Sequence, residues 1–593
     1  MADDLPKGGS FLIEETDPAS IFTPEDFTEE QRMFAKTAED FIHNEVIPKI
    51  EQTEAKEEGV MVELLKKSGE LGLLMIDVPE KYGGLELDKA TSMLVTEVIS
   101  KGGAFAVTYA VHIGIGTLPV SYFGTPVQKE KYLTKLATGE LIGSYALTEA
   151  GSGSDALAAK TRADLSDDGK YYILNGEKTF LSNGGFADLI IVFAKVGGEE
   201  FSAFIVERGY DGLTLGAEEK KLGIRGSSTV QIFLDNVKVP VENLLGEKGK
   251  GHKIAFNILN VGRFKLGVGS VGSAKIAIDD SIKYANERQQ FGKPIASFGM
   301  IKNKIANMAT YTYVTESMSY RTAGLMDGIL SPIDRDADDA SELTMKGIEE
   351  YVTECSIMKV KGTEMIGYVA DESVQIFGGY GYVEDYPAER YFRDARIGRI
   401  YEGTNEINRM LIPGMLLKRA MKGEIPLMAA AKKLQDELLE FPMMEETEEE
   451  GLLIEEKKLV QNVKKVSLLT AGVAVQKFMD KLQDQQGVLG NLADIIIEAY
   501  GMESALLRTL KIAASKGEDG ADVVFKMTRL YIYDTIGKID QWAREVLAAC
   551  SDGDELRTML AALRRLTRNI PVDTLGLRLE IADYFIEKEK YEI

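Results

Sequence analysis

Apolar residues recur at helical spacing along the first quarter of the chain. Thr28 and Gln31 stand three residues apart in front of FAKTAEDFIHNEVI, the arrangement of a helix capping box. The segment MVELLKKSGELGLLMI (61–76) also has helical apolar spacing. Pro79 and Gly83-Gly84 interrupt the pattern, and LVTEVISKGG resumes it. We therefore predict an N-terminal tail over residues 1–24 and a helical domain over residues 25–140.

Residues 141–250 have a different pattern. Runs rich in β-branched and aromatic residues, such as LIIVFAKV, FSAFIVE and VQIFLDNVKV, follow one another with turn signals between them. Asn175-Gly176 lies inside YYILNGEKTFLSN and predicts a tight hairpin turn between two strands. These features favour an antiparallel β domain, a sandwich or barrel, over βαβ units.

Long helical patterns return over residues 251–420, for example VGSAKIAIDDSIKYANERQ. Residues 421–450 end in an acidic run and are predicted to be a solvated linker. Residues 451–593 are helical again and form a further C-terminal domain. The predicted fold class is α+β: an N-terminal helical domain, a middle antiparallel β domain, a helical bundle and an additional C-terminal helical domain.

Composition narrows the functional classes. The chain has 45% hydrophobic and 27% charged residues, as a soluble protein with a sizeable core does. A formal net charge of −25 argues against nucleic-acid binding and against a basic membrane-binding face. The sequence shows no secretory signal, no arginine-rich transit peptide and no run of about 18 apolar residues, so no stable membrane insertion is expected. We expect a cytoplasmic protein, or a mitochondrial matrix protein if this is a processed eukaryotic chain.

Cysteine and histidine are too sparse to suggest a metal site. Cys355 and Cys550 lie far apart with no CxxC or histidine companion, so neither a disulfide framework nor a zinc site is predicted. The three histidines, His43, His112 and His252, are scattered and are expected to be structural.

Glu402 is the most informative single residue. It follows Tyr401, precedes Gly403 and has the apolar Ile397 and Ile400 just upstream. A carboxylate in an apolar pocket resists ionisation, so its pKa rises toward the range that suits a general base. The segment alone leaves open a second interpretation, a solvated glutamate at the end of a helix.

Two glycine-containing segments call for opposite interpretations. Residues 267–272, GVGSVG, match the G-x-G-x-x-G pattern but follow a helical segment rather than a strand, so we interpret them as small residues where helices pack closely. Residues 145–156, YALTEAGSGSDA, interleave hydroxyls and glycines at the edge of the β region. Such a loop can bring backbone amides and hydroxyls to an anionic or ring-shaped ligand, although an ordinary turn has the same composition.

Five segments in order resemble the signatures of the acyl-CoA dehydrogenases. They are YALTEAGSGSDA, FLSNGG (180–185), ERQQFGKPI (287–295), QIFGGYGY (375–382) and YEGTNEI (401–407). The resemblance covers about residues 25–415, and the helical segment after residue 450 resembles the extension of the very-long-chain branch. It implies an enzyme of fatty-acid β-oxidation that removes two hydrogens from an acyl-CoA to give trans-2-enoyl-CoA.

The resemblance implies FAD as the cofactor. The residues expected at the flavin ring are Tyr145, Leu147, Thr148, Phe180 and Ser182, with further FAD contacts from Thr404 and Glu406. The residues expected at the adenine and pyrophosphate end of a neighbouring subunit's FAD are Arg288, Gln290, Phe291, Gln375, Gly378 and Gly379. Two positions depart from the family: Phe180 stands where relatives commonly have tryptophan, and Phe298-Gly299 where they often have a glutamine contact. A site divided in this way implies a homo-oligomer, a dimer in preference to a tetramer.

The resemblance also gives substrate residues and a catalytic base. Ser154, Asn260, Arg263, Tyr401 and Gly403 are expected to contact the acyl-CoA, with Arg263 near the phosphate end of CoA. A surface helix arginine is the alternative interpretation of Arg263. Glu402 is expected to remove the α-proton of the thioester while the β-hydrogen leaves as hydride to the flavin. Its backbone N–H and an FAD ribityl hydroxyl would stabilise the enolate oxygen.

Two further positions separate branches of the family. Some relatives place the base immediately before the arginine that corresponds to Arg263, but here that position is Gly262, which cannot serve. Val107 and Val111 stand where medium-chain relatives have polar residues in the floor of the acyl pocket, so a long or very long acyl chain is favoured.

The expected partner is an electron-transferring flavoprotein. Two alternatives stay open from the sequence: an acyl-CoA oxidase that returns electrons to oxygen, and a catalytically silent family member that acts as an assembly or scaffold protein.

Overall fold

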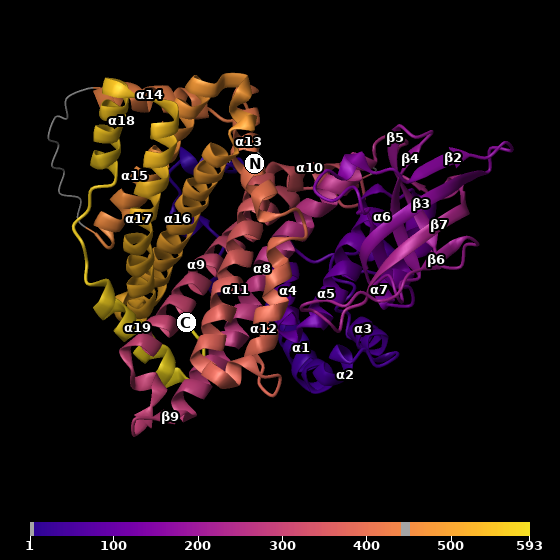
Figure 1. The fold of residues 1–593 in the computed structure, drawn as a ribbon, viewed down its shortest axis with the longest axis horizontal. Helices are drawn as coiled ribbons and strands as arrows, with labels where there is room; N and C mark the ends of the chain where they lie inside the picture. Colours follow the sequence, from indigo (N-terminus) through magenta and orange to yellow (C-terminus); the bar gives the residue numbers. More distant parts are fainter. Residues whose placement is uncertain (1–4, 338, 440–450) are drawn as a thin grey trace.

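The computed structural model describes residues 5–337, 339–439 and 451–593. Figure 1 shows the β domain at one side of the molecule, long helices in the middle and the C-terminal helices at the other side. The predicted fold class, α+β with helical domains before and after a middle β domain, is confirmed.

The N-terminal helices pack against the middle of the molecule and cover one side of the β domain (Figure 1). They are α1 (Glu29–Phe41), α2 (Ile50–Glu54), α3 (Val60–Glu70), α4 (Lys89–Ile99), α5 (Ala104–Ala110), α6 (Leu118–Phe123) and α7 (Pro126–Thr138). The predicted capping box is confirmed, since the Thr28 side chain accepts from Gln31 N–H and the Gln31 side chain accepts from Thr28 N–H.

One helical stretch of this domain is longer and more apolar than the sequence alone led us to expect of any segment. Ala104–Phe123 is long and apolar enough to cross a bilayer by length and composition, and no other helix of the described residues is. However, 78% of its apolar window is buried inside the fold, as in a core helix of a soluble protein.

The middle domain is built on one eight-stranded sheet in the order β6-β7-β3-β2-β4-β5-β8, with β1 paired to β4. The strands are β1 (Gly143–Ala146), β2 (Arg162–Leu165), β3 (Tyr171–Ser182), β4 (Leu189–Val196), β5 (Glu200–Glu207), β6 (Leu213–Leu215), β7 (Thr229–Pro240) and β8 (Leu244–Leu245). Most pairs are antiparallel as predicted, but β1 and β2 both run parallel to β4.

The predicted hairpin turn at Asn175-Gly176 is wrong. These residues lie inside β3, where the register against β7 shifts between Leu174 and Gly176. Gly176 has a φ of 149°, and a Cβ there would lie 2.6 Å from the Thr161 hydroxyl. The glycine therefore serves a bulge. The turn lies earlier, at Gly169 (φ 68°), where Ser166 N–H donates to Tyr171 O and joins β2 to β3.

The central bundle consists of α8 (Gly251–Glu287), α9 (Gly299–Leu330), α10 (Ala340–Glu350), α11 (Val352–Phe377), α12 (Ala388–Ala395) and α13 (Asn405–Met421). The short hairpin β9 (Gln289–Gln290) and β10 (Lys293–Pro294) projects from one end of it (Figure 1). The G-x-G-x-x-G segment lies within α8, as predicted. A Cβ at Gly267 would lie 2.6 Å from Met358 O, and one at Gly272 only 1.8 Å from Glu97 O. These glycines allow close helix packing.

The C-terminal helices are α14 (Leu427–Leu439), α15 (Ile454–Phe478), α16 (Gln486–Gly520), α17 (Asp522–Cys550), α18 (Gly553–Leu566) and α19 (Thr574–Lys588). The predicted linker differs from the structure, because α14 occupies part of it and buries Leu427 and Leu434 in the main core. The acidic run itself, residues 445–450, lies outside the described residues. The predicted N-terminal tail also packs against the core: Gly9 N–H donates to Glu354 Oε1 of α11 at 2.7 Å, and Phe11 and Leu12 are buried in the main core.

Candidate active site

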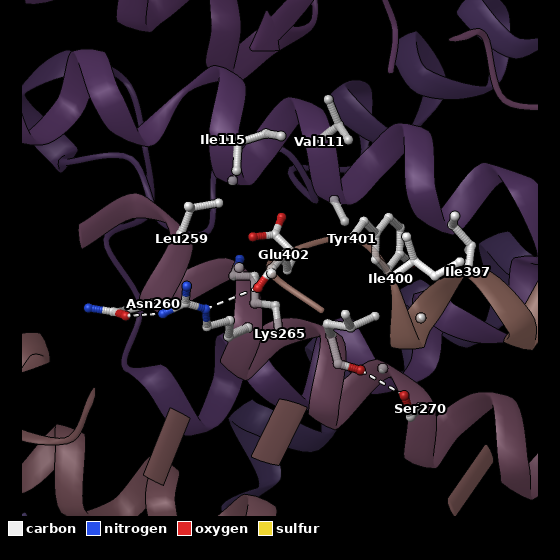
Figure 2. Close-up of a pocket in the computed structure, with 18 of the residues that line it drawn as sticks. Val111, Ile115, Leu259, Asn260, Lys265, Ser270, Ile397, Ile400, Tyr401 and Glu402 are labelled. Atoms are coloured by element: carbon white, nitrogen blue, oxygen red, sulfur yellow. Dashed lines mark hydrogen bonds between the residues drawn. The ribbon is translucent and has the colours of Figure 1, made fainter. Parts of the chain in front are cut away.

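A cavity of about 1350 Å³ lies between the β domain and the central bundle. Its walls come from the loop after β1, from β3, from α5 and from one face of α8, and Glu402 lies in its lining. Figure 2 shows the Glu402 carboxylate near Leu259 and Tyr401, with Val111 and Ile115 on the opposite wall. The cavity therefore brings a carboxylate to an apolar space.

The Glu402 segment links the turn Arg396–Arg399 to α13 through an unusual backbone. Glu402 has a φ of 58° and Gly403 a φ of 79°, so two successive residues adopt the left-handed conformation. A non-glycine residue in this region is strained and needs support from its surroundings. Thr404 then begins α13 as its N-cap, and its hydroxyl accepts from Ile407 N–H at 3.3 Å.

Three side chains from three helices hold the carbonyls of this segment. Arg263 Nε (α8) donates to Glu402 O at 3.1 Å, and Lys359 Nζ (α11) donates to Gly403 O at 2.6 Å. Asn408 Nδ2 (α13) donates to the carbonyl oxygens of Gly403 and Thr404, each at 3.0 Å. Neither Lys359 nor Asn408 was predicted from the sequence.

Burial decides the ionisation of Glu402. Desolvation raises the pKa of its carboxyl to about 7, against the opposing effect of the positive charges of Arg263 and Lys359. Its Oε2 is buried and has no hydrogen-bond partner among the described residues. A carboxyl that is half ionised near neutral pH and has a free oxygen facing a cavity can act as a general base. The alternative of a solvated glutamate does not fit this environment.

Gly262 lies directly against the same carboxylate. A Cβ on Gly262 would lie 2.9 Å from Glu402 Cδ and 2.9 Å from its Oε2. The two positions that could carry a base thus converge on one point, and glycine at 262 leaves that point to Glu402.

The five residues predicted at a flavin ring all line this cavity: Tyr145, Leu147, Thr148, Phe180 and Ser182. Phe180 has a φ of 59° and is 66% exposed, so the fold presents its ring to the open space. Tyr145 OH and Thr179 Oγ1 are buried without a partner among the described residues, and Thr179 was not predicted. Unpaired polar atoms and an exposed aromatic ring in the lining of one cavity fit a flat polar cofactor such as a flavin.

The residues predicted at the adenine and pyrophosphate end of a neighbouring subunit's FAD lie away from this cavity. Phe291 is 92% exposed on the β9–β10 hairpin, and the Arg288 guanidinium lies 5.4 Å from the centre of the Tyr380 ring. Tyr380 follows Gly378 and Gly379 in the turn after α11, which ends just beyond Gln375. None of the six residues of this set lines the cavity: Arg288, Gln290, Phe291, Gln375, Gly378 and Gly379. One chain therefore does not bring the two predicted parts of the cofactor site together (Figure 1).

The predicted substrate residues line the cavity: Ser154, Asn260, Arg263, Tyr401 and Gly403. Arg263 is only 6% exposed, so the surface alternative is wrong, and its Nη1 donates to Asn260 Oδ1 at 3.0 Å (Figure 2). Thr404 also lines the cavity, whereas Glu406 faces solvent in the first turn of α13. The described residues contain no cluster of side chains suited to a metal ion.

Family comparisons cover most of the chain. The family described as acyl-CoA dehydrogenase, N-terminal domain, matches residues 28–140, and the middle domain of the same family matches residues 144–237. Two families described as acyl-CoA dehydrogenase, C-terminal domain, match residues 249–417 and 462–565.

Individual relatives extend this similarity. The chain is 49% identical to a probable acyl-CoA dehydrogenase of Bacillus subtilis, over all of this chain and 99% of that protein. It is 41% identical to the human mitochondrial very long-chain specific acyl-CoA dehydrogenase over 58% of this chain and 51% of that protein. A crystal structure of an acyl-CoA dehydrogenase complexed with FAD from Bacillus anthracis superimposes with a TM-score of 0.96 at 50% identity, over 99% of this chain and 100% of that chain.

Proposed function

The chain belongs to the acyl-CoA dehydrogenase family, and on that premise we propose that it oxidises a long or very long fatty acyl-CoA to the trans-2-enoyl-CoA. It is an oxidoreductase acting on CH–CH donors, and its cofactor is FAD. The observation that carries the proposal is the buried Glu402 carboxylate, which faces a large apolar cavity and has one oxygen without a hydrogen-bond partner in the part of the chain that the structure describes.

In the proposed reaction Glu402 is the base. Its carboxylate takes the α-proton of the thioester, the α and β C–H bonds break, and a carbon–carbon double bond forms between these two carbons. Bound FAD supplies the hydride acceptor for the β-hydrogen. Because burial raises the pKa of Glu402 to about 7, the carboxylate is basic enough to remove a weakly acidic proton and is still largely ionised above neutral pH.

The backbone of the same segment supports the enolate. Since the carbonyls of Glu402, Gly403 and Thr404 are held by Arg263, Lys359 and Asn408, the Glu402 N–H stays available. It has no acceptor among the described residues. We propose that it donates to the thioester oxygen, where negative charge develops as the proton leaves.

The cofactor is assigned to the cavity side of the β domain. Tyr145, Thr148, Thr179 and Ser182 offer hydroxyl and backbone groups to the flavin ring, and Phe180 packs against it. Thr404 and Glu406 remain proposed contacts at the start of α13, and Ser154 remains a proposed contact to CoA.

The proposed length of the acyl chain follows from the part of the cavity that extends away from Glu402 along α8. Gly262, Leu266, Gly269 and Ser273 line it from one face of α8, a span of about 16 Å at 1.5 Å per residue. Val107 and Val111 line the opposing side. Small and apolar walls over this length favour a long acyl chain.

We also propose the oligomeric state, the electron acceptor and the cellular location of the enzyme. The separation of Arg288, Gln290 and Phe291 from the cavity supports a homodimer in which these residues, with Gln375, Gly378 and Gly379, hold the other subunit's FAD. We infer an electron-transferring flavoprotein as the acceptor, on the basis of the family. The full-length similarity to a Bacillus subtilis protein supports a cytoplasmic location.

The test is anaerobic mixing of the holoenzyme with acyl-CoAs of increasing length. The proposal expects the flavin absorbance to bleach, fastest with long chains, and the reduced enzyme to be reoxidised faster by an electron-transferring flavoprotein than by air. Absence of bleaching with every acyl-CoA would refute the proposed dehydrogenation. Rapid reoxidation in air with release of hydrogen peroxide would instead identify an acyl-CoA oxidase.

A further inference from the structure

The backbone under Glu402 is held by a buried cation that the reaction chemistry does not itself require. Lys359 is fully buried on α11, and its Nζ donates to Gly403 O and to Asn405 Oδ1, both at 2.6 Å. An ammonium taken out of water costs free energy unless its surroundings replace the lost hydration. Here two oxygens from the segment that follows Glu402 do so.

We propose that Lys359 is a positioning residue for the base: its ammonium holds the Gly403 carbonyl on the α11 side, so that the Glu402 carboxylate and N–H face the cavity. The proposal rests on the proposed function, because it concerns the same base. Nothing in the sequence around Lys359 indicates it, since Lys359 and Gly403 meet only in the folded chain.

The geometry of the segment explains why one hydrogen bond matters. With φ values of 58° and 79°, Glu402 and Gly403 hold a conformation that isolated residues of this kind rarely adopt. The peptide between them carries the Glu402 carbonyl, which Arg263 holds, and the next peptide carries the Gly403 carbonyl, which Lys359 holds. Without the second contact, Glu402 and Gly403 can relax toward ordinary φ values. Rotation about the N–Cα bond of Glu402 then changes the direction of its carboxylate relative to its own N–H, so the two groups no longer face the cavity together.

Lys359 also acts on Glu402 through its charge. The charged groups that act on the Glu402 carboxylate are Arg263 from α8 and Lys359 from α11, and both lower its pKa against the effect of burial. Burial in turn lowers the pKa of the Lys359 ammonium to about 8, with Glu402, Glu406 and Glu364 opposing this effect and Arg263 adding to it. Over most of the neutral range Lys359 is therefore charged while Glu402 ionises.

Two substitutions separate the hydrogen bond from the charge. Lys359→Met removes both, whereas Lys359→Gln removes the charge and keeps a donor for the Gly403 carbonyl. In both variants we expect the pH profile of flavin bleaching to move about one unit to higher pH, because a nearby positive charge is lost. We expect Lys359→Met also to lower the maximal rate by about 10- to 100-fold, because the N–H and the carboxylate lose their orientation.

Lys361→Met is the matched control. Lys361 lies two residues further along the same helix and pairs with Glu498 and Tyr531 of the C-terminal domain, away from the cavity. Its loss removes a part-buried charge from α11 without touching the Glu402 segment. We expect its pH profile and maximal rate to stay near those of the wild type.

A second readout does not depend on turnover. An acyl-CoA analogue with sulfur in place of the β-carbon has an acidic α-proton but no β-hydrogen, so a pH titration of its complex reports α-proton removal alone. We expect Lys359→Met to move that titration to higher pH and Lys361→Met not to move it. If Lys359→Met fails to fold or to retain FAD, Lys359→Gln still tests the charge through its shifted profile. Lys359→Ser, whose side chain is too short to reach the Gly403 carbonyl, then tests the hydrogen bond through its maximal rate.

The outcomes distinguish this proposal from the proposed function. If wild-type enzyme is not bleached by any acyl-CoA, the proposed function fails. If the wild type is bleached but the Lys359 variants keep its pH profile and rate, as Lys361→Met does, the positioning role of Lys359 is overturned and the function stands.

Discussion

A methyl group placed on Gly262 would lie 2.9 Å from the carboxylate carbon of Glu402, closer than such contacts normally come. The backbone of α8 thus forms the floor on which the proposed base rests. This contact also explains why only one of the two positions can carry a large side chain.

We predict that Gly262→Ala lowers the rate of flavin bleaching by at least about tenfold while FAD remains bound. The added methyl must displace the carboxylate, and displacements of about 1 Å can cost on the order of 100-fold in rate. Single-turnover absorbance measurements check this. Gly414→Ala is the control, because a Cβ there meets nothing within 4 Å. An unchanged rate in Gly262→Ala would show that the carboxylate is free to move or is not the base.

The pH dependence of the reaction follows from the same residue. Since burial raises the pKa of Glu402 to about 7, the base is protonated and inactive below that pH and ionised above it. We predict that the single-turnover rate rises with pH and reaches half of its maximum near pH 7. A rate that is flat from pH 5 to pH 8 would contradict the assignment of a buried carboxyl.

A second buried carboxyl, Glu354 on α11, gives a stability prediction. It is 1% exposed, accepts from Gly9 N–H at 2.7 Å, and burial raises its pKa to about 7. A carboxyl whose pKa is higher in the folded chain stabilises that state at low pH, and the contribution is lost as the pH rises toward 7. Glu354→Gln keeps the acceptor without the charge. It should stabilise the protein at pH 8 by on the order of 2–3 kcal/mol and have little effect at pH 4.5.

Thermal unfolding at the two pH values checks this prediction. An equal shift of melting temperature at both pH values would show that ionisation of Glu354 plays no part.

The packing of α8 gives a third kind of test. A Cβ on Gly272 would lie 1.8 Å from the Glu97 carbonyl oxygen of α4, so Gly272→Ala should force the helices apart and destabilise the fold by about 1–3 kcal/mol. Gly414→Ala, also within a helix, should be neutral or stabilising. Equal melting temperatures for the two variants would mean that α4 and α8 do not pack this closely.

The proposed preference for a long acyl chain can be tested by comparing two substrates in one variant. Ser273 lines the cavity eleven residues beyond Gly262 on α8, so Ser273→Phe should fill its far end. We predict at least about a tenfold loss of kcat/KM for hexadecanoyl-CoA, roughly the loss of one well-filled end of an apolar pocket, with octanoyl-CoA little affected. Equal losses for both substrates would place the acyl chain elsewhere.

The sequence predicted correctly those structural features that depend on residues close together in the chain. The Thr28–Gln31 capping box is a contact within one helical turn, and the residues of the YEGT segment are adjacent in the sequence. The fold class followed from hydrophobic spacing, and the family from five ordered segments, both of which the structure and the relatives confirm.

Features that depend on distant contacts were missed. Asn175-Gly176 has the sequence of a hairpin turn, but pairing of β3 with β7 on one side and β2 on the other keeps the chain extended there. Lys359 is an ordinary lysine in an amphipathic sequence, and its hydrogen bond to Gly403 O appears only when α11 packs under the Glu402 segment. No local signal distinguishes it from Lys361.

The role of Glu402 as the base that removes the α-proton is tested by comparing Glu402→Gln with wild-type enzyme in anaerobic mixing with a long-chain acyl-CoA. Glutamine keeps the shape and the backbone of the segment but cannot accept the proton. We predict a yellow variant that retains FAD and binds acyl-CoA, yet bleaches at least about 1000-fold more slowly, in the range expected when general-base catalysis is lost. Glu342→Gln, the same substitution at an exposed glutamate of α10, is the control and should bleach like the wild type. Bleaching of Glu402→Gln at the wild-type rate would show that another group removes the α-proton.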